Sequence, residues 1–161
     1  MNDTTTRTAT VTTPADREIR IEREFDAPRD VVFRTMTDPA LIPEWWGPRG
    51  STAVVDQMDV RQGGRWRFVF REEDGSELGF HGTYREVSPP ERLVQTFEWE
   101  GMPGHVSVET ATFEDLGDRT RLVTTTVFHT TEERDGMLGA GMESGMNETH
   151  QRLDELLARV G

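Results

Sequence analysis

Few side chains in this sequence could perform chemistry, and they are widely spaced. The four histidines are His81, His105, His129 and His150. None stands in an HxxxH or HExxH pattern, so their spacing predicts no histidine metal site. Cysteine is absent, which excludes disulfides, thiolate nucleophiles and cysteine-based metal centres. There is no GxSxG motif either. We therefore expect no catalytic residue, no metal and no cofactor.

Carboxylates are numerous, and most alternate outward on strands or lie on the polar sides of helices, where exposure to solvent explains them. Glu143 is the exception, because it neighbours Met142 on the apolar side of the expected final helix. A carboxyl group pointing into an apolar pocket has a raised pKa and can act as an acid or a base. Glu143 is the first candidate for such a role, and a solvated position is the alternative.

The charge balance narrows the range of partners. Thirty acidic residues face eighteen basic ones, all arginine, and the net charge is −12. A negative field repels phosphate backbones, so we expect no nucleic-acid partner. No apolar stretch is long enough to span a membrane, and residues 1–13 have no signal-peptide pattern. We expect a cytoplasmic protein without a membrane partner.

The chain reads as a disordered arm over residues 1–17 and a single domain over residues 18–161. Ile19, Ile21 and Phe25 alternate with charged residues, which predicts a strand with Arg23 as an unusual inward member. Prolines at 28 and 39 then predict the starts of two short helices.

Six further strands follow, and their short connections make neighbouring strands antiparallel. They are expected near residues 52–60, 64–72, 78–88, 91–100, 105–115 and 119–129. A capping box at 130–133 precedes apolar residues at helical spacing, which predicts one helix of nearly thirty residues. The fold class is α+β: a curved seven-stranded antiparallel sheet around a long C-terminal helix, with two short helices after the first strand.

Strand alternation predicts which side chains face the helix. In the strand near residues 64–72 the aromatic residues share one face, and the other face carries Arg65, Arg67 and Arg71. We therefore expect the aromatic face to point inward. The expected inward positions are Trp66, Phe68, Phe70, Phe80, Gly82, Tyr84, Leu93, Gln95, Phe97, Trp99, Val106, Val108, Thr110, Thr112, Leu122, Thr124, Thr126 and Phe128.

A dry core rarely contains so many hydroxyl and amide groups, because each one left unpaired costs about 1–3 kcal/mol. This favours a hollow interior that holds water or a ligand. The alternative is that the threonines pair across strands, or that the alternation slips at a bulge. The candidate ligand-binding residues are Trp45, Trp66, Phe68, Phe80, Tyr84, Gln95, Phe97, Trp99, Met142 and Met146.

Two local patterns bear on this cavity. Trp45 and Trp46 diverge by about 100° on a helix, so one can pack in the core while the other lines the cavity mouth. Four glycines at 136, 139, 141 and 145 alternate with methionines near the start of the final helix. They favour either a compliant lid or a frayed helix start.

An ordered set of motifs resembles the START-like, helix-grip superfamily. Within it, residues 18–159 resemble bacterial homologues of the activator of the ninety-kilodalton heat-shock protein ATPase, also called SRPBCC domains. The motifs are Phe25-Asp-Ala-Pro28, Thr37-Asp-Pro39, Trp45-Trp-Gly-Pro48, Asp59-Val-Arg-Gln-Gly-Gly64 with Trp66, Gly82-Thr-Tyr84, Pro89-Pro-Glu-Arg-Leu93, Thr120-Arg-Leu122, Gly141-Met-Glu-Ser-Gly-Met146 and Leu153-Asp-Glu-Leu156. The resemblance implies a sheet curved around the C-terminal helix over a deep cavity. Relatives on this fold bind lipids and hydrophobic ligands, cyclise polyketides or assist a chaperone.

The leading hypothesis is a binding module for a small hydrophobic or amphipathic molecule. The alternatives are a cyclase, aromatase or dehydratase that uses the same cavity, or a chaperone-associated interaction domain. A perturbed inward carboxylate or imidazole would favour the enzyme. A homodimer could form through outward residues, namely Val94, Thr96, Val123, Thr125 and Val127.

Overall fold

A computed structural model describes residues 9–47 and 49–160. Most of its strands follow one another along the chain without a helix between them. The elements are β1 (Thr10–Thr12), β2 (Glu18–Phe25), α1 (Arg29–Met36), α2 (Ile42–Trp45), β3 (Ala53–Met58), β4 (Arg65–Arg71), β5 (Glu77–Ser88), β6 (Arg92–Trp99), β7 (Val106–Asp115), β8 (Thr120–Val127), α3 (Thr131–Gly139) and α4 (Met142–Val160). Within the described residues, no helix is both long and apolar enough to cross a membrane.

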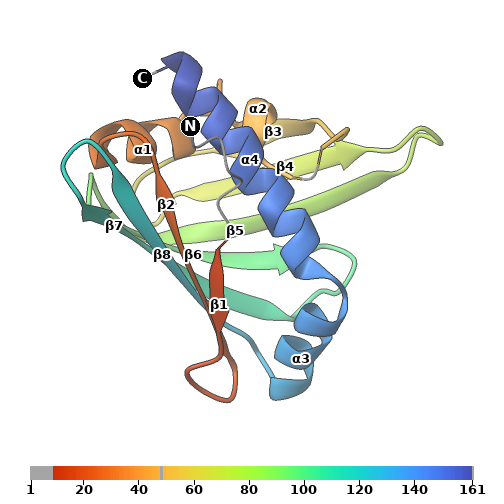
Figure 1. Ribbon diagram of the computed structural model, residues 1–161. Coiled ribbons are helices and arrows are strands. Elements are labelled where there is room, and N and C mark those ends of the chain that lie inside the picture. Colours follow the sequence, from red (N-terminus) through yellow and green to blue (C-terminus); the bar gives the residue numbers. More distant parts are fainter. Residues whose placement is uncertain (1–8, 48, 161) are drawn as a thin grey trace.

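The strands form one antiparallel sheet in the order β1-β2-β8-β7-β6-β5-β4-β3. The fold class is α+β: the sheet curves around α4, which crosses the concave face of the sheet (Figure 1). The short helices α1 and α2 lie near the C-terminal part of α4, and α3 lies at its other end. Burial of the apolar side of α4 against the sheet explains the arrangement, because Leu153, Leu156 and Leu157 are its buried residues.

The sheet has eight strands, so the expected count of seven was wrong. The additional strand is β1, which pairs with β2 at the edge of the sheet, for example Val11 opposite Ile21. It lies inside the expected disordered arm, where threonine repeats hide its β propensity among polar residues. The rest of that arm, residues 1–8, lies outside the described residues.

The expected single final helix is also corrected, because it is two helices. Thr130 caps α3, its hydroxyl accepting a hydrogen bond from the Glu133 amide at 3.1 Å, as the capping box predicted. The helix ends at Gly139, and Gly141 has a φ of +78°. A left-handed residue cannot continue an α-helix, so the chain restarts as α4 at Met142.

One strand of the sheet faces the opposite way from the prediction. Leu93 is a core residue on the concave face, and it pairs with Ala111 of β7. The inward residues of β7 are therefore Ser107, Glu109, Ala111 and Phe113. The expected inward set, Val106, Val108, Thr110 and Thr112, lies on the convex face.

Arg23 points inward, as the strand alternation predicted, and links the sheet to the helix. Its side chain is 1% exposed and donates two hydrogen bonds to Asp154 of α4, at 2.8 and 2.7 Å. The guanidinium also lies over the Phe25 ring, 4.6 Å from its centroid. This partly buried ion pair fixes α4 against β2.

Candidate functional site

The aromatic part of the concave face is packed rather than hollow. Trp46 leaves α2 in an extended conformation, and its ring contacts several aromatic rings of the sheet. Its centroid lies 5.0 Å from Phe68, 5.5 Å from Phe70 and 5.6 Å from Phe80. Trp66 is 1% exposed and donates its indole N–H to the Thr96 carbonyl at 3.2 Å. This end of the interior therefore belongs to the core.

The ten candidate residues are distributed over several environments. Trp45, Trp66, Phe68 and Tyr84 are buried in the core cluster. Phe80 borders an open depression beside the β4–β5 hairpin. Gln95, Met142 and Met146 are half-buried. Phe97 and Trp99 are the two that border an apolar pocket.

That pocket lies between α3 and the adjoining ends of β6 and β7, and we call it the α3 pocket. Its volume is about 470 Å³, within the usual range of small-molecule sites. The lining residues are Phe97, Trp99, Met102, His105, Ser107, Phe128, Glu132, Glu133, Gly136, Met137 and Ala140. Rings and thioethers make up its apolar wall, and two glutamates from α3 belong to the same wall.

Polar side chains on the concave face continue inward from this pocket. The strand register places Tyr84, Gln95, Glu109 and Thr126 in one row across the sheet, next to the pocket residue Ser107. The side chains of Gln95, Glu109 and Thr126 are half-buried, and none forms a hydrogen bond or ion pair with another described residue. Polar groups without protein partners are tolerated where space remains for solvent or a ligand.

Burial perturbs two ionisable groups in this row. It raises the pKa of the Glu109 carboxyl group above its ordinary value. It also raises the pKa of the Tyr84 hydroxyl, with a smaller contribution from Asp59. Both groups therefore favour their uncharged forms in the absence of a compensating charge.

His150 of α4 is a third perturbed group, in another part of the interior. Its Nδ1 is buried without a hydrogen-bond partner among the described residues, and its ring meets Phe25 edge-on at 5.5 Å. Burial, assisted by the positive charge of Arg23, lowers the pKa of His150 to about 4. Phe25 lies six residues along β2 from Ile19, which faces the Glu109 row, a separation of about 20 Å. Glu109 and His150 are therefore not an acid–base pair.

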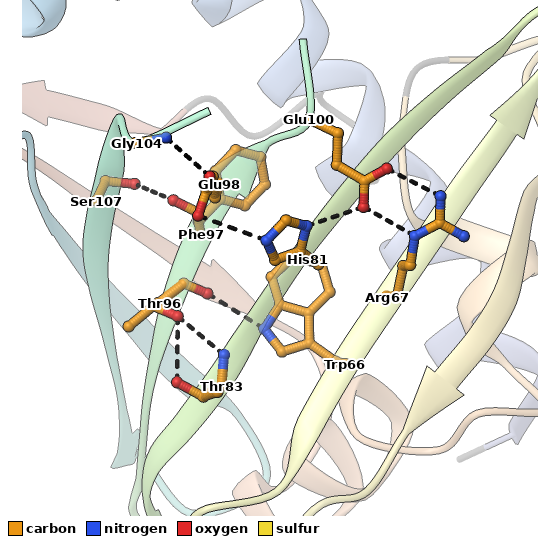
Figure 2. A network of polar contacts seen from close by, with 10 residues as sticks. All are labelled: Trp66, Arg67, His81, Thr83, Thr96, Phe97, Glu98, Glu100, Gly104 and Ser107. Carbon is orange, nitrogen blue, oxygen red and sulfur yellow. Dashed lines mark hydrogen bonds and ion pairs between the residues drawn. The ribbon is translucent and has the colours of Figure 1, made fainter. Parts of the chain in front are cut away.

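A polar network on the convex face holds the turn that carries part of the pocket wall (Figure 2). Arg67 donates to both oxygens of Glu100, at 2.8 and 2.9 Å, and His81 contacts the same carboxylate at 2.8 Å. These contacts lower the pKa of Glu100 to about 2, and the hydrogen bonds from Arg67 contribute most. Glu98 accepts the Gly104 amide hydrogen bond at 2.9 Å. The turn between Glu98 and Gly104 carries the pocket residues Trp99 and Met102.

Other candidate sites carry less chemistry. Glu143 is exposed on α4, so it does not point into an apolar pocket. No group of three or more potential ligands among the described residues could hold a metal ion. On the convex face, Val94 and Val123 are already covered, at 9% and 7% exposed, and a homodimer through this face stays a prediction.

Sequence reasoning missed three residues that shape the interior. Trp46 fills the aromatic part, Met137 borders the α3 pocket, and Glu109 faces inward. The tandem tryptophans indicated that one of the two rings would pack in the core, but they did not indicate which rings of the sheet Trp46 would contact. Glu109 gave no such signal, since it alternates with valine and threonine as an ordinary outward residue does.

Solved structures of several bacterial proteins share this fold. A protein from Rhodobacter sphaeroides superposes with a TM-score of 0.87 at 24% identity, covering 95% of this chain and 99% of that one. A protein from Arthrobacter aurescens gives 0.83 at 25% identity, covering 93% and 91%. The AHSA1 protein from Silicibacter pomeroyi gives 0.73 at 25% identity, covering 89% and 99%. Among curated proteins, none matches the sequence.

The family assignment rests on most of the chain. Residues 26–158 match the model of the family described as Activator of Hsp90 ATPase homolog 1-like protein. The matched segment begins just before α1 and ends in the last turn of α4, so it spans strands β3 to β8 of the curved sheet and the helix that the sheet surrounds. The chain belongs to the Activator of Hsp90 ATPase homolog 1-like family and has its helix-grip fold.

Proposed function

We propose that this chain binds a small hydrophobic or amphipathic molecule in the α3 pocket. The observation that supports this most is the pocket itself: about 470 Å³ of space bordered by aromatic and thioether side chains. Apolar surface of this kind gains free energy when a ligand displaces water from it. The row of unpartnered polar groups behind the pocket can orient a polar end of such a ligand.

The wall of the pocket fits a reversible binding site. Trp99 is 39% exposed and Met137 is 42% exposed, although both are large apolar side chains. Methionine adapts to ligands of different shape, because it has three rotatable bonds and a polarizable sulfur atom. Large exposed apolar side chains that gather around a hollow are typical of binding surfaces.

Two glycines of α3 provide a matched test of the site. Gly136 borders the pocket and Gly139 does not, and a Cβ atom at either position meets nothing within 4 Å. A Gly136→Leu side chain should fill the pocket without displacing its neighbours, whereas Gly139→Leu should leave the pocket open. Both substitutions replace glycine with a better helix former.

The assay is titration with Nile red, an uncharged dye whose emission rises in apolar surroundings. The wild type and Gly139→Leu should show saturable emission, and Gly136→Leu should bind the dye at least about tenfold more weakly, a difference of about 1.4 kcal/mol. Absence of saturable binding to the wild type would refute the proposal. Equal binding by the two leucine variants would place the site elsewhere. The enzymatic and chaperone-associated alternatives stay predictions.

A further inference from the structure

The charges around the α3 pocket favour one class of ligand. Among the described residues that border it, Glu132 and Glu133 are acidic and none is arginine. The one basic side chain is His105, whose Nδ1 lies 2.8 Å from Glu133 Oε2, so it already faces a carboxylate. The net charge of the whole chain is −12. Negative charge around a cleft concentrates cations and repels anionic ligands.

A further carboxylate lies beside the pocket on the concave face. Ser107 borders the pocket, and Glu109 is the next inward residue on β7, about 7 Å along the strand. Its inward neighbours on that strand, Ser107 and Ala111, have small side chains. Gln95 lies directly opposite Glu109 on β6 and adds an amide to the same place.

Among the residues that the structure describes, no cation compensates Glu109. None of the described residues forms an ion pair with its carboxylate. The inward residue Arg23 is instead bound to Asp154. In the strand register Arg23 lies opposite Leu122 of β8, whereas Glu109 lies opposite Thr126, four residues farther along β8. A half-buried carboxylate of this kind is costly unless it is protonated or meets a positive partner. Its raised pKa reflects this cost.

We infer that the ligand is an aromatic or aliphatic amine, whose protonated nitrogen donates hydrogen bonds to Glu109 while its apolar part lies in the α3 pocket. This inference rests on the proposed function and adds the chemical class of the ligand. The aromatic wall suits the same class, because an ammonium group passing Phe97 and Trp99 is attracted by the ring faces. Fatty acids and other anions would meet the carboxylates of Glu132 and Glu133 at the pocket and no arginine among its lining residues.

Three ligands of equal shape and different charge test the inference by isothermal titration calorimetry at pH 7. They are 1-naphthylmethylamine, 1-naphthylmethanol and 1-naphthoate, which are cationic, neutral and anionic. The wild type should bind the amine about tenfold to a hundredfold more tightly than the alcohol, the range expected for a charge-assisted hydrogen bond. The carboxylate should bind most weakly.

Glu109→Gln removes the charge with little change of shape. Its matched control is Glu114→Gln, which changes the same charge on the same strand but on the convex face, where Glu114 pairs with Arg121. The amine preference should disappear in Glu109→Gln and persist in Glu114→Gln, and Glu114→Gln should leave the affinity for the alcohol unchanged.

The outcomes separate the inference from the proposed function on which it rests. Equal binding of amine and alcohol by the wild type, or preference for the carboxylate, would overturn the amine inference and leave a hydrophobic site. An amine preference that survives in Glu109→Gln would overturn the role of Glu109. Failure of all three to bind would overturn both proposals. The wild-type comparison needs no variant, so it decides the ligand class even if Glu109→Gln does not fold.

Discussion

Protonation of His150 should make the protein lose stability in mildly acidic solution. The pKa of this imidazole is lowered from 6.5 to about 4 in the folded protein, first by burial and then by the charge of Arg23. The unfolded chain therefore takes up this proton at a higher pH than the folded protein does. The stabilising contribution is complete above pH 6.5, and it is lost as the pH falls from 6.5 towards 4.

The magnitude follows from the two pKa values. They differ by about 2.5 pH units, and each unit corresponds to about 1.4 kcal/mol, so the loss approaches about 3 kcal/mol by pH 4. This is a large part of the stability of an ordinary domain, about 5–15 kcal/mol. Many carboxylates also titrate in this range, so the contribution of His150 must be isolated by a variant that lacks the imidazole.

The comparison uses His150→Gln, with His129→Gln as the control because His129 is exposed. Free energies of unfolding from urea titrations at pH 7, 6, 5 and 4.5 would be compared. Between pH 7 and 4.5 the wild type and His129→Gln should each lose more stability than His150→Gln, by about 2–3 kcal/mol. Parallel curves for the wild type and His150→Gln would refute the reasoning, as would an NMR titration in which the His150 ring becomes protonated near pH 6.5.

Four single substitutions and one double variant test the architecture through urea denaturation. Gly145→Ala, whose Cβ meets open space, should stabilise α4 by about 1 kcal/mol, whereas Gly141→Ala, at a φ of +78°, should destabilise by about 1–2 kcal/mol. Equal effects would contradict the helix break. Asp154→Ala should lower the free energy of unfolding by about 2 kcal/mol, less than for a fully buried ion pair because the Asp154 side chain is 38% exposed. Adding Arg23→Met should recover part of that loss, and no recovery would contradict the account of the ion pair. Gly82→Ala should cost about 3 kcal/mol, because its Cβ would collide with the carbonyl of the neighbouring strand and an indole; a near-neutral result would count against this packing.

Local alternation predicted the strands well where the two faces differ strongly in chemistry. In β4, Trp66 and Phe68 alternate with arginines, and their inward direction was evident from the sequence. Arg23 was also foreseen as inward, and its buried ion pair with Asp154 explains why a charge is tolerated there. Pro28 and the capping box located the starts of α1 and α3, because the chemistry that starts a helix is local. The start predicted at Pro39 was wrong, since α2 begins at Ile42.

Long-range pairing explains the residues that the sequence could not place. In β7, valine and threonine alternate with serine and glutamate, so the apolar pattern favours the wrong face. The pairing of Gln95 with Glu109 settles the direction of the strand, and that register depends on contacts far apart in sequence. Likewise, Trp46 packs among rings of β4 and β5 that no local pattern associates with it.

The most direct test of ligand binding in the α3 pocket is a ¹H–¹⁵N NMR titration of the wild type with 1-naphthylmethanol. We expect saturable shifts of backbone amides around the pocket, with Ser107, Gly136 and Met137 among the strongest. Shifts gathered around His81 on the convex face, or no saturable shift anywhere, would contradict the account.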